Sequence, residues 1–530
     1  MTKALRMIPL GGCGEFGRNI TAYEGVPDAE GVRPIVVVDC GAQFPEVEAP
    51  GVELFLPDFR WLAAERERVV AWVITHAHED HLRALPRGLA AAPAPVYGRP
   101  FTMRMAENLL REHGMRGDLH VLSPGSIVEL GGFSLEALPV AHSIPDACAI
   151  ALTSGGSTIV HTGDLKLELD DEGRADLTRL EAIGARGVAL LALDSTNATR
   201  PGRSRREADV EIALRDAVAA CKQRVLVTQF ASNVGRVAAL CRVAQACDRQ
   251  ICFIGRGLRE TTEIGRSLGL LRPPAELVIG EDAASWAPPD KVLLVATGSQ
   301  GEPLSALGKL ASDQHRKLAL DPGDAVIFSS RPVPGNELRV ERIVDELLER
   351  GIVIVDRPEL HASGHAAIDE LSELIRALRP AVVAPLHGRA RQLEALATLA
   401  EGLGVQVARV RDGDVWEIGA GAGARRIGEV PSGRVSLEGQ GPNAALGDIG
   451  PATLKDRIKL SRGGLVLAGR DAQGQWTVRA FGVCELPALA PILKAVLEAL
   501  GPTTTSEAAS RAIGRVFERA RGVRPAVVVL

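Results

Sequence analysis

The chain has 530 residues, of which 46% are hydrophobic and 24% charged, and its formal net charge is −5. This length exceeds what one ordinary core can organise, so two or three domains are predicted. No apolar run reaches the roughly 18 residues that a membrane span needs, and no signal-peptide pattern opens the chain, so we expect a cytoplasmic protein with no membrane attachment.

Cysteine content and charge narrow the function classes further. The eight cysteines include no CxxC pair, which favours reduced core residues over a disulfide scaffold. The slightly acidic balance argues against a wholly electrostatic nucleic-acid binder, although it permits a local basic groove. Only 3% of the residues are aromatic, so base stacking would not be widespread. Any nucleic acid would therefore be held mostly through its backbone.

The first third of the chain predicts strands. Ile35–Val38 runs into Asp39-Cys40-Gly41, and Val69–Ile74 runs into Thr75-His76, as buried strands with polar loops at their carboxyl ends do. Many strands with few helices between them indicate layered sheets whose chemistry lies on the loops at one edge.

From about Asp194 the pattern changes to alternating helices and strands. Helices are predicted at Glu207–Cys221, Gly235–Cys247 and Arg259–Leu268, and strands at Arg224–Thr228, Gln250–Ile254, Val292–Thr297 and Ala325–Ser329. This alternation is typical of a parallel sheet covered on both faces. A third segment begins near Glu429 and contains a predicted hairpin around Gln473-Gly474-Gln475, followed by helices at Leu489–Leu500 and Ser506–Arg521.

The strongest functional signal is Thr75-His76-Ala77-His78-Glu79-Asp80-His81, directly after an apolar strand. In an extended loop, residues two apart point to the same side, so His76 and His78 can converge on one metal while Asp80 and His81 project towards a neighbouring point. Imidazoles with a carboxylate suit Zn²⁺ better than Mg²⁺ or Ca²⁺. One zinc ion would leave a ligand unused, so the spacing favours two. The alternative is a solvated histidine-rich loop.

A binuclear site needs ligands from elsewhere in the chain. His142, Asp164 and His387 each lie at or just beyond a strand-like run. Each alone is more typical of a hydrogen-bonded structural residue. Their occurrence together with the first cluster favours metal binding.

Taken in order, the motifs resemble the metallo-β-lactamase superfamily, whose HxHxDH motif corresponds to His76–His81. Within it, the chain is similar to the β-CASP nucleic-acid-processing branch and the ribonuclease J family. The resemblance extends from Gly11 to about Arg457 and rests on a series of short motifs: Gly11–Asn19, Phe44–Glu46, Leu56–Asp58, His142–Asp146, His161–Lys166, Asp194–Asn197, Phe230–Asn233, Thr297–Pro303, Pro334–Glu337, His361–His365 and His387-Gly388.

The resemblance implies an α/β fold in which an αββα metallo-β-lactamase sandwich carries an inserted β-CASP α/β domain and a small α+β C-terminal domain. The expected boundaries are 1–200 and 351–427 for the core, 201–350 for the β-CASP domain and 428–530 for the last domain. It further implies two Zn²⁺ per subunit. The first would take His76, His78 and His142, and the second Asp80, His81 and His387, with Asp164 bridging and Asp39 supporting the ligands.

The implied activity is that of a zinc-dependent ribonuclease with 5′→3′ exonuclease and endonuclease activity in RNA maturation and decay. A bridging hydroxide would attack the phosphodiester, with His365 and Asp194 in acid–base roles. Asp194 has an alternative interpretation as a turn or capping residue.

Substrate contacts are expected from His361, Ala362, Ser363, Gly364 and His365, which could wrap a phosphate, and from Ser232 and Asn233, which resemble the family's 5′-phosphate pocket. Such a pocket predicts a preference for 5′-monophosphorylated, single-stranded RNA over triphosphorylated RNA. The sequence departs from the family pattern at Gly235, where a histidine is common, and at Arg389-Ala390, where Glu-Tyr is common. The basic run Arg200, Arg203, Arg205 and Arg206 could line the RNA path or form a solvated loop.

The sequence leaves other functions open. A lactamase-fold hydrolase of thioesters or lactones would lack the segment from Asp194 to Val355, whereas a related DNA nuclease would share it. A catalytically silent RNA-processing scaffold would be expected to have lost ligands. The resemblance also implies a homodimer or homotetramer, and membership of an RNA-degradation complex.

Overall fold

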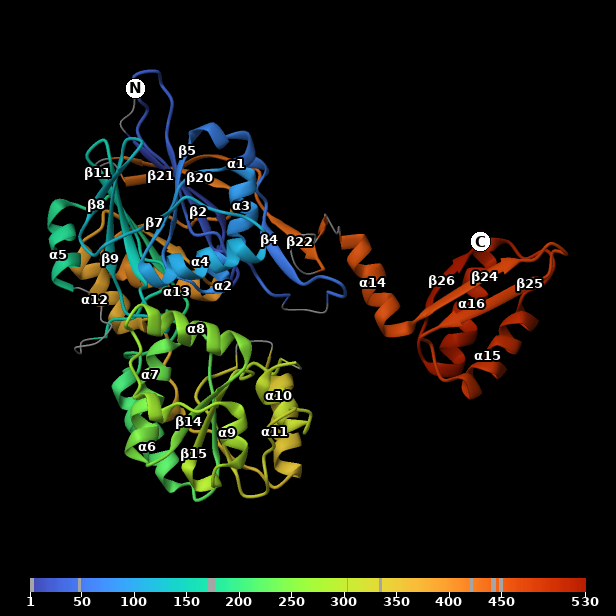
Figure 1. Cartoon of the computed structure of the whole chain (residues 1–530). Coiled ribbons are helices and arrows are strands. Elements are labelled where there is room, and N and C mark those ends of the chain that lie inside the picture. The colour runs from blue at the N-terminus through green and yellow to red at the C-terminus, as the bar shows by residue number, and fades with distance from the viewer. Residues whose placement is uncertain are drawn as a thin grey trace. The chain divides into compact units, whose positions relative to one another are not determined.

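The structure is a computed structural model that describes residues 4–45, 49–168, 177–302, 304–332, 336–419, 423–439, 445–447 and 451–530. It divides into two compact units (Figure 1). The first unit comprises Met1–Gln43 and Leu56–Arg434, and the second comprises Phe44–Phe55 and Val435–Leu530. Parts of the motifs ending at Glu46 and Pro303 and around Pro334 lie outside the described residues.

Two sheets form the core of the first unit. The first has the order β21-β20-β1-β2-β3-β5-β6-β7, with β1 (Leu5–Gly11), β2 (Ile20–Glu24), β3 (Ile35–Val38), β5 (Val69–Ile74), β6 (Val96–Gly98), β7 (Leu119–Val121), β20 (Asp414–Gly419) and β21 (Gly423–Glu429). The second has the order β19-β18-β12-β11-β10-β9-β8, with β8 (Ile127–Leu130), β9 (Phe133–Pro139), β10 (Cys148–Ser154), β11 (Ser157–His161), β12 (Leu190–Asp194), β18 (Val382–Leu386) and β19 (Gln406–Val407).

Apolar side chains join the two sheets and attach the helices outside them. Val38 and Val73 of the first sheet share one buried cluster with Leu135 and Ile150 of the second. A separate cluster packs α5 (Leu177–Arg186), α12 (Ile368–Leu378) and α13 (Ala390–Gly402) on the other face of the second sheet. With α1 (Arg60–Ala64), α3 (Leu85–Ala91) and α4 (Pro100–Glu112) beside the first sheet, the layers follow the expected αββα order (Figure 1).

A five-stranded parallel sheet is inserted between β12 and β18. Its order is β14-β15-β13-β16-β17, from β13 (Val225–Thr228), β14 (Gln250–Ile254), β15 (Val292–Ala296), β16 (Ala325–Phe328) and β17 (Val353–Val355). The connecting helices are α6 (Glu207–Ala220), α7 (Val234–Ala246), α8 (Arg256–Ser267), α9 (Glu281–Trp286), α10 (Ala306–Ala311) and α11 (Glu337–Glu349). Strands that are buried on both faces have continuous apolar sequences. Because these runs stand out in the sequence, the positions of the strands could be predicted.

The second unit contains a three-stranded sheet with helices packed against it. β24 (Leu465–Arg470) lies between β25 (Trp476–Phe481) and β26 (Ala526–Val529), and α15 (Leu486–Ala499) and α16 (Ser506–Arg521) bury their apolar residues on it. The unit also includes α14 (Pro451–Gly463) and the pair of β22 (Arg434–Glu438) with β23 (Ala445–Gly447). The expected hairpin is confirmed, since β24 and β25 pair antiparallel across Gly474, whose φ of 76° suits a tight turn.

In the described part of the first third, helices are fewer than strands, as expected, but α4 was not predicted. α4 (Pro100–Glu112) has 13 residues and starts with proline at its first position, which favours helix initiation. It buries Met103, Ala106 and Leu110 at helical spacing. This buried face packs against α3 and β7.

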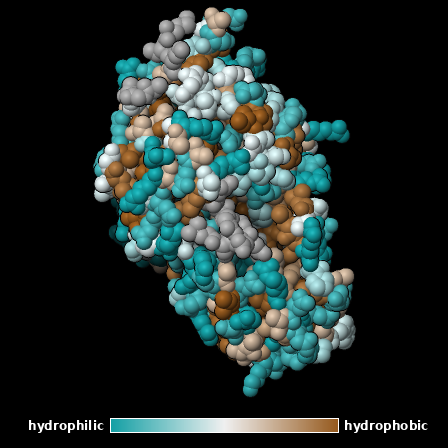
Figure 2. All heavy atoms as spheres, turned by 90° about the vertical axis from the view of Figure 1, so that its left-hand side faces the viewer, coloured by the Kyte–Doolittle hydropathy of each residue, from teal (hydrophilic) through white to brown (hydrophobic). Residues whose placement is uncertain are grey.

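No helix in the described part of the chain is long and apolar enough to cross a membrane. On the face shown in Figure 2, hydrophobic residues form separate clusters among hydrophilic ones.

Candidate metal centre

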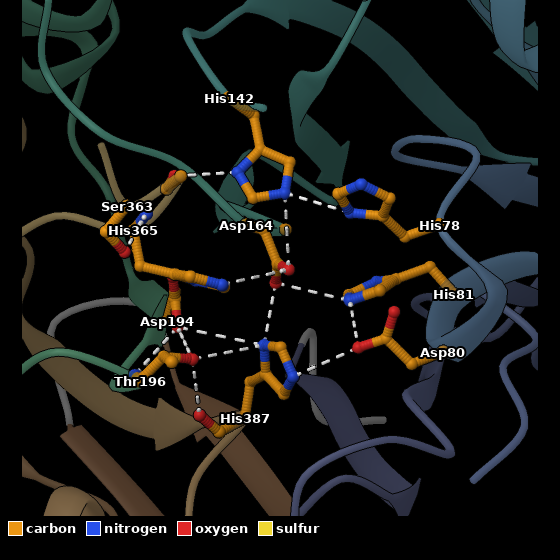
Figure 3. A network of polar contacts seen from close by, with 12 residues as sticks. His78, Asp80, His81, His142, Asp164, Asp194, Thr196, Ser363, His365 and His387 are labelled. Atoms are coloured by element: carbon orange, nitrogen blue, oxygen red, sulfur yellow. Dashed lines mark hydrogen bonds and ion pairs between the residues drawn. The ribbon is translucent and has the colours of Figure 1, made fainter. Parts of the chain in front are cut away.

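The predicted ligands lie at one edge of the two sheets. His76 to His81 follow β5, with Glu79–Leu82 forming the short helix α2, and His142 follows the end of β9. β11, β12 and β18 are parallel neighbours, so their carboxyl ends bring Asp164, Asp194 and His387 to the same place. Figure 3 shows the side chains of His78, His81, His142, Asp164 and His387 pointing towards a common centre.

Two groups of candidate ligands share Asp164. His76, His78, His142 and Asp164 form the first group, and Asp80, His81, Asp164 and His387 form the second; in each group the ligand atoms lie within 4.8 Å of one another. Asp164 Oδ2 is 3.6 Å from His76 Nε2 and 3.7 Å from His142 Nε2. Asp164 Oδ1 is 3.2 Å from His81 Nε2 and 2.7 Å from His387 Nδ1. One carboxylate oxygen thus faces each group.

Hydrogen bonds behind the ligands fix their ring orientations. His142 Nδ1 donates to the carbonyl of Gly364 at 2.7 Å, which leaves Nε2 facing the centre. His81 Nδ1 lies 2.7 Å from Asp39 Oδ2, and Asp39 also accepts from the Thr75 backbone N–H at 2.7 Å. Both arrangements are those by which ligand histidines are held in one tautomer.

The nitrogen atoms of the first group lie close enough together to need a cation between them. His78 Nδ1 lies 3.1 Å from His76 Nε2 and 3.0 Å from His142 Nε2. Lone pairs that converge this closely repel one another unless a proton or a cation lies between them. Burial lowers the pKa of His78 to about 4 and the pKa values of His76 and His142 well below their usual range, which disfavours protons. Nitrogen donors with one carboxylate fit Zn²⁺.

The second group carries more negative charge. Burial alone would lower the pKa of His387, but Asp164 and Asp80 raise it to about 10. Burial likewise opposes a charged His81, whose pKa Asp164, Asp80 and Asp39 raise well above its usual value. The pKa of Asp164 is held well below its usual range, because His387 and His81 outweigh the effect of burial. The carboxylates therefore favour positive charge at this position.

Asp194 and His365 form a third group with Asp164 and His387. His365 Nδ1 lies 2.7 Å from Asp194 Oδ2, and its Nε2 lies 3.9 Å from Asp164 Oδ2. Asp194 also accepts from the backbone N–H and the hydroxyl of Thr196, at 2.9 and 2.7 Å. Both interpretations of Asp194 therefore apply: Oδ1 accepts the turn hydrogen bonds from Thr196, and Oδ2 contacts His365.

Several residues at the centre were not predicted. Asn19 Nδ2 lies 3.0 Å from His81 Nε2 and donates to the carbonyl of Asp80 at 3.1 Å. A Cβ at Gly41 would lie 1.6 Å from that same carbonyl oxygen, so the loop requires glycine there. Asn19 ends the motif Gly11–Asn19, and that motif was the only sequence signal that could have pointed to it.

A small cavity lies behind the second group. Its volume is about 20 Å³, and Asp39, His161 and Thr162 are among the residues that line it. His161 Nδ1 lies 2.8 Å from the hydroxyl of the buried Tyr23, and burial lowers the pKa of His161 to about 4. The cavity has room for one water molecule.

The predicted substrate-binding residues occupy different environments. Ser232 Oγ lies 3.2 Å from His78 Nε2, beside the first group. Asn233 caps α7, because its side chain accepts from the Arg236 N–H at 2.8 Å. At Gly235 a Cβ would have Asn233 Oδ1 at 3.7 Å as its nearest atom, so this departure from the family pattern leaves room for a side chain.

The segment His361–His365 borders both Asp194 and His142. Ser363 Oγ accepts from Asn197 Nδ2 at 2.8 Å, and Ala362 is buried. A Cβ at Gly364 would lie 2.6 Å from the His142 ring, so this glycine is needed beside a candidate ligand. Burial, with Arg236 nearby, lowers the pKa of His361 to about 4.

The basic run is largely engaged within the chain. Arg203 pairs with Glu373 at 2.7 Å and Arg206 with Asp209 at 2.7 Å. Arg205 donates to the carbonyl of Pro358. Three of its four arginines therefore have intramolecular partners, which favours the loop interpretation over an RNA path.

Three family models match successive parts of the chain. They are described as "Metallo-beta-lactamase superfamily" over residues 33–214, "Ribonuclease J, beta-CASP domain" over 222–347 and "Zn-dependent metallo-hydrolase RNA specificity domain" over 358–410. Ribonuclease J of Mycolicibacterium smegmatis is 37% identical over 536 residues, covering 96% of this chain and 94% of that protein. The chain belongs to the ribonuclease J family.

Further relatives agree with this assignment. Ribonuclease J of Sinorhizobium meliloti is 38% identical, covering 87% of this chain and 82% of that protein, and that of Thermus thermophilus is 35% identical, covering 94% and 88%. A solved structure of a protein of unknown function from Enterococcus faecalis shares the fold, with a TM-score of 0.57 and 17% identity over 78% of this chain and 99% of that one. The predicted family and fold class are confirmed, and membership makes the protein a metal-dependent ribonuclease.

Proposed function

We propose that this ribonuclease holds two zinc ions per subunit and degrades RNA by 5′→3′ exonuclease and endonuclease cleavage in RNA maturation and decay. The observation that carries the proposal is the division of Asp164 between two ligand groups, with one oxygen towards each. His76, His78 and His142 would hold the first ion, and Asp80, His81 and His387 the second. A single ion would leave one of these groups without a cation.

When bound, two zinc ions supply a water of near-neutral pKa and positive charge beside the phosphoryl oxygens. The chain's own residues supply orientation and protons. Asp194 holds His365 through Nδ1 at 2.7 Å, so that Nε2 points towards Asp164. Asp194 and Asp164 raise the pKa of His365 against the effect of burial. A protonated His365 would then give its Nε2 proton to the leaving 3′-oxygen, and the downstream fragment would keep a 5′-phosphate.

The substrate we propose is single-stranded RNA with a 5′-monophosphate. Ser232 lies next to His78, and the loop His361–His365 lies next to His142, so a terminal phosphate bound between them would lie beside the first ligand group. Ser363 and the backbone of this loop offer donors to phosphate oxygens. We expect this site to favour one phosphate over three.

The decisive test combines metal analysis with end-labelled RNA. Two zinc ions per chain are expected, together with labelled mononucleotides from 5′-labelled RNA and progressively shortened fragments from 3′-labelled RNA. A matched DNA oligonucleotide separates this activity from that of a DNA nuclease. One zinc ion per fully active chain, or uncleaved RNA with both ions bound, would refute the proposal.

We propose in addition a homodimer or homotetramer, as part of an RNA-degradation complex in a reducing cytoplasm. The eight free cysteines are consistent with that compartment. Light scattering on the purified protein would give the oligomer number directly.

A further inference from the structure

One aromatic ring lies directly beside the candidate metal centre. The rings of Phe16 and His387 meet in a T-shaped contact, with centroids 6.1 Å apart and an interplanar angle of 80°. The guanidinium of Arg389 lies 5.7 Å from the centroid of Phe16. Phe16 is partly exposed and Arg389 is exposed. The two residues therefore form a surface of one ring and one cation next to a candidate ligand of the second metal.

The loop that carries Phe16 is held in place on both sides of the ring. The Gly14 N–H donates to the carbonyl of Gly388 at 2.9 Å. Arg18 is buried, pairs with Glu15 and donates to the carbonyl of Gly433 at 2.5 Å. A ring fixed in this way loses little conformational freedom when a ligand packs on it.

Phe16 and the candidate 5′-phosphate pocket border different metal groups. Ser232 contacts His78 of the first group, whereas Phe16 contacts His387 of the second. This step rests on the proposed function: with the terminal phosphate near Ser232 and the cleaved phosphate over the metals, the RNA leaves towards Phe16. The nucleotide following the cleaved bond would therefore lie beside the ring.

We propose that Phe16 and Arg389 bind this following nucleotide, the ring stacking on its base and the guanidinium contacting its phosphate. Base–aromatic stacking is tolerant of sequence, because every base has a π-face. In the described part of the chain, Phe16 is the only Phe, Tyr or Trp ring in contact with a candidate ligand. At positions 389 and 390 the sequence departs from the family pattern, so this surface is a feature of this chain's own residues.

The test must distinguish two roles of Phe16: stacking on an RNA base, and packing against His387 to hold that ring in place. Phe16→Leu retains an apolar contact with His387 and removes the aromatic face. We would compare two 5′-monophosphorylated RNAs that differ only in the second nucleotide, which is normal in one and abasic in the other. The wild type should process the abasic RNA about 5- to 140-fold less efficiently, as expected for one stacked base. Phe16→Leu should process both RNAs at the reduced rate, with unchanged zinc content.

Additive effects of Phe16→Leu and the abasic position would overturn the proposal, because they would show that ring and base do not interact. The same comparison with uncleaved 2′-O-methyl RNAs, measured by fluorescence anisotropy, does not depend on cleavage. A wild type that binds these RNAs with the expected coupling yet cleaves none would thus contradict the proposed function and support this site.

The role of Arg389 is tested by salt dependence. Arg389→Gln should weaken RNA binding and reduce the slope of log affinity against log salt by about one. Arg376→Gln, at an exposed arginine on α12, is the matched control and should leave the slope unchanged. An unchanged slope in Arg389→Gln would remove Arg389 from the site.

Discussion

His387 Nδ1 lies 2.7 Å from Asp164 Oδ1, although 223 residues separate the two in the chain. This contact closes the second ligand group and connects it to the first through the other oxygen of Asp164. Metal content should therefore respond differently to the two residues. His387→Ala should lose about one zinc ion per chain, whereas Asp164→Ala should lose both, measured by elemental mass spectrometry after dialysis. Equal loss in the two variants would contradict a shared Asp164.

Asp39 should tune the second metal without binding it. It accepts from His81 Nδ1 at 2.7 Å and from the Thr75 N–H at 2.7 Å, and its φ of 63° is unusual for a residue other than glycine. Removing such a supporting carboxylate typically weakens metal affinity about 10- to 100-fold. Asp39→Asn should therefore release one zinc ion at lower chelator concentration than the wild type does. Simultaneous release of both ions at the wild-type concentration would argue against this role.

Much of this centre could be predicted because its ligands follow apolar runs that are unmistakable strands. His76 and His78 follow one such run, and Asp164 and His387 follow others, so the edge of the sheets could be inferred from local patterns. What could not be inferred depends on distant packing. The demand for glycine at position 364 arises from His142, 222 residues away. The assignment of Phe44–Phe55 to the second unit has no local signal either.

Gly364→Ala should damage the first ligand group. A Cβ at this position would lie 2.6 Å from the His142 ring and 2.9 Å from Ser143 Oγ, so the ring must move away from the centre. We expect a lower zinc content and a loss of activity in proportion to it. Gly235→Ala is the matched control, because a Cβ there has no atom closer than 3.7 Å and alanine favours the α7 helix by up to about 1 kcal/mol. Full zinc occupancy in Gly364→Ala would contradict this prediction, because it would show that the loop around residue 364 moves and the His142 ring does not.

Substitution of His365 should lower kcat without releasing the metals. His365→Gln keeps a hydrogen-bonding side chain but removes the titrating proton, so kcat should fall about 10²- to 10⁴-fold. Asp194→Asn should lower kcat less, since His365 stays in position. Both variants should retain two zinc ions. If either loses an ion, the group formed by Asp164, Asp194, His365 and His387 binds metal instead, and the acid–base assignment is wrong.

Asp412 should make stability depend on pH. Burial raises its pKa from 3.8 to about 6, with Arg18 opposing and Glu15 adding to the effect, and it accepts from the Cys13 N–H at 3.1 Å. Between about pH 4 and pH 6 the folded state thus keeps a proton that the unfolded state has released, so stability falls as pH rises through this window. A shift of this size corresponds to about 3 kcal/mol.

Asp412→Asn cannot ionise and still offers an acceptor to Cys13. Its melting temperature should nearly match that of the wild type around pH 4, exceed it increasingly up to about pH 6 and level off by pH 7. The gain is reduced by whatever the 3.4 Å contact with Arg18 contributes. Arg18 keeps its partner Glu15 in the variant, which limits that loss. The exposed Asp345→Asn serves as the control and should show no such trend. A difference between Asp412→Asn and wild type that stays constant from pH 4 to pH 7 would mean that this carboxyl ionises as freely in the folded protein as in the unfolded chain.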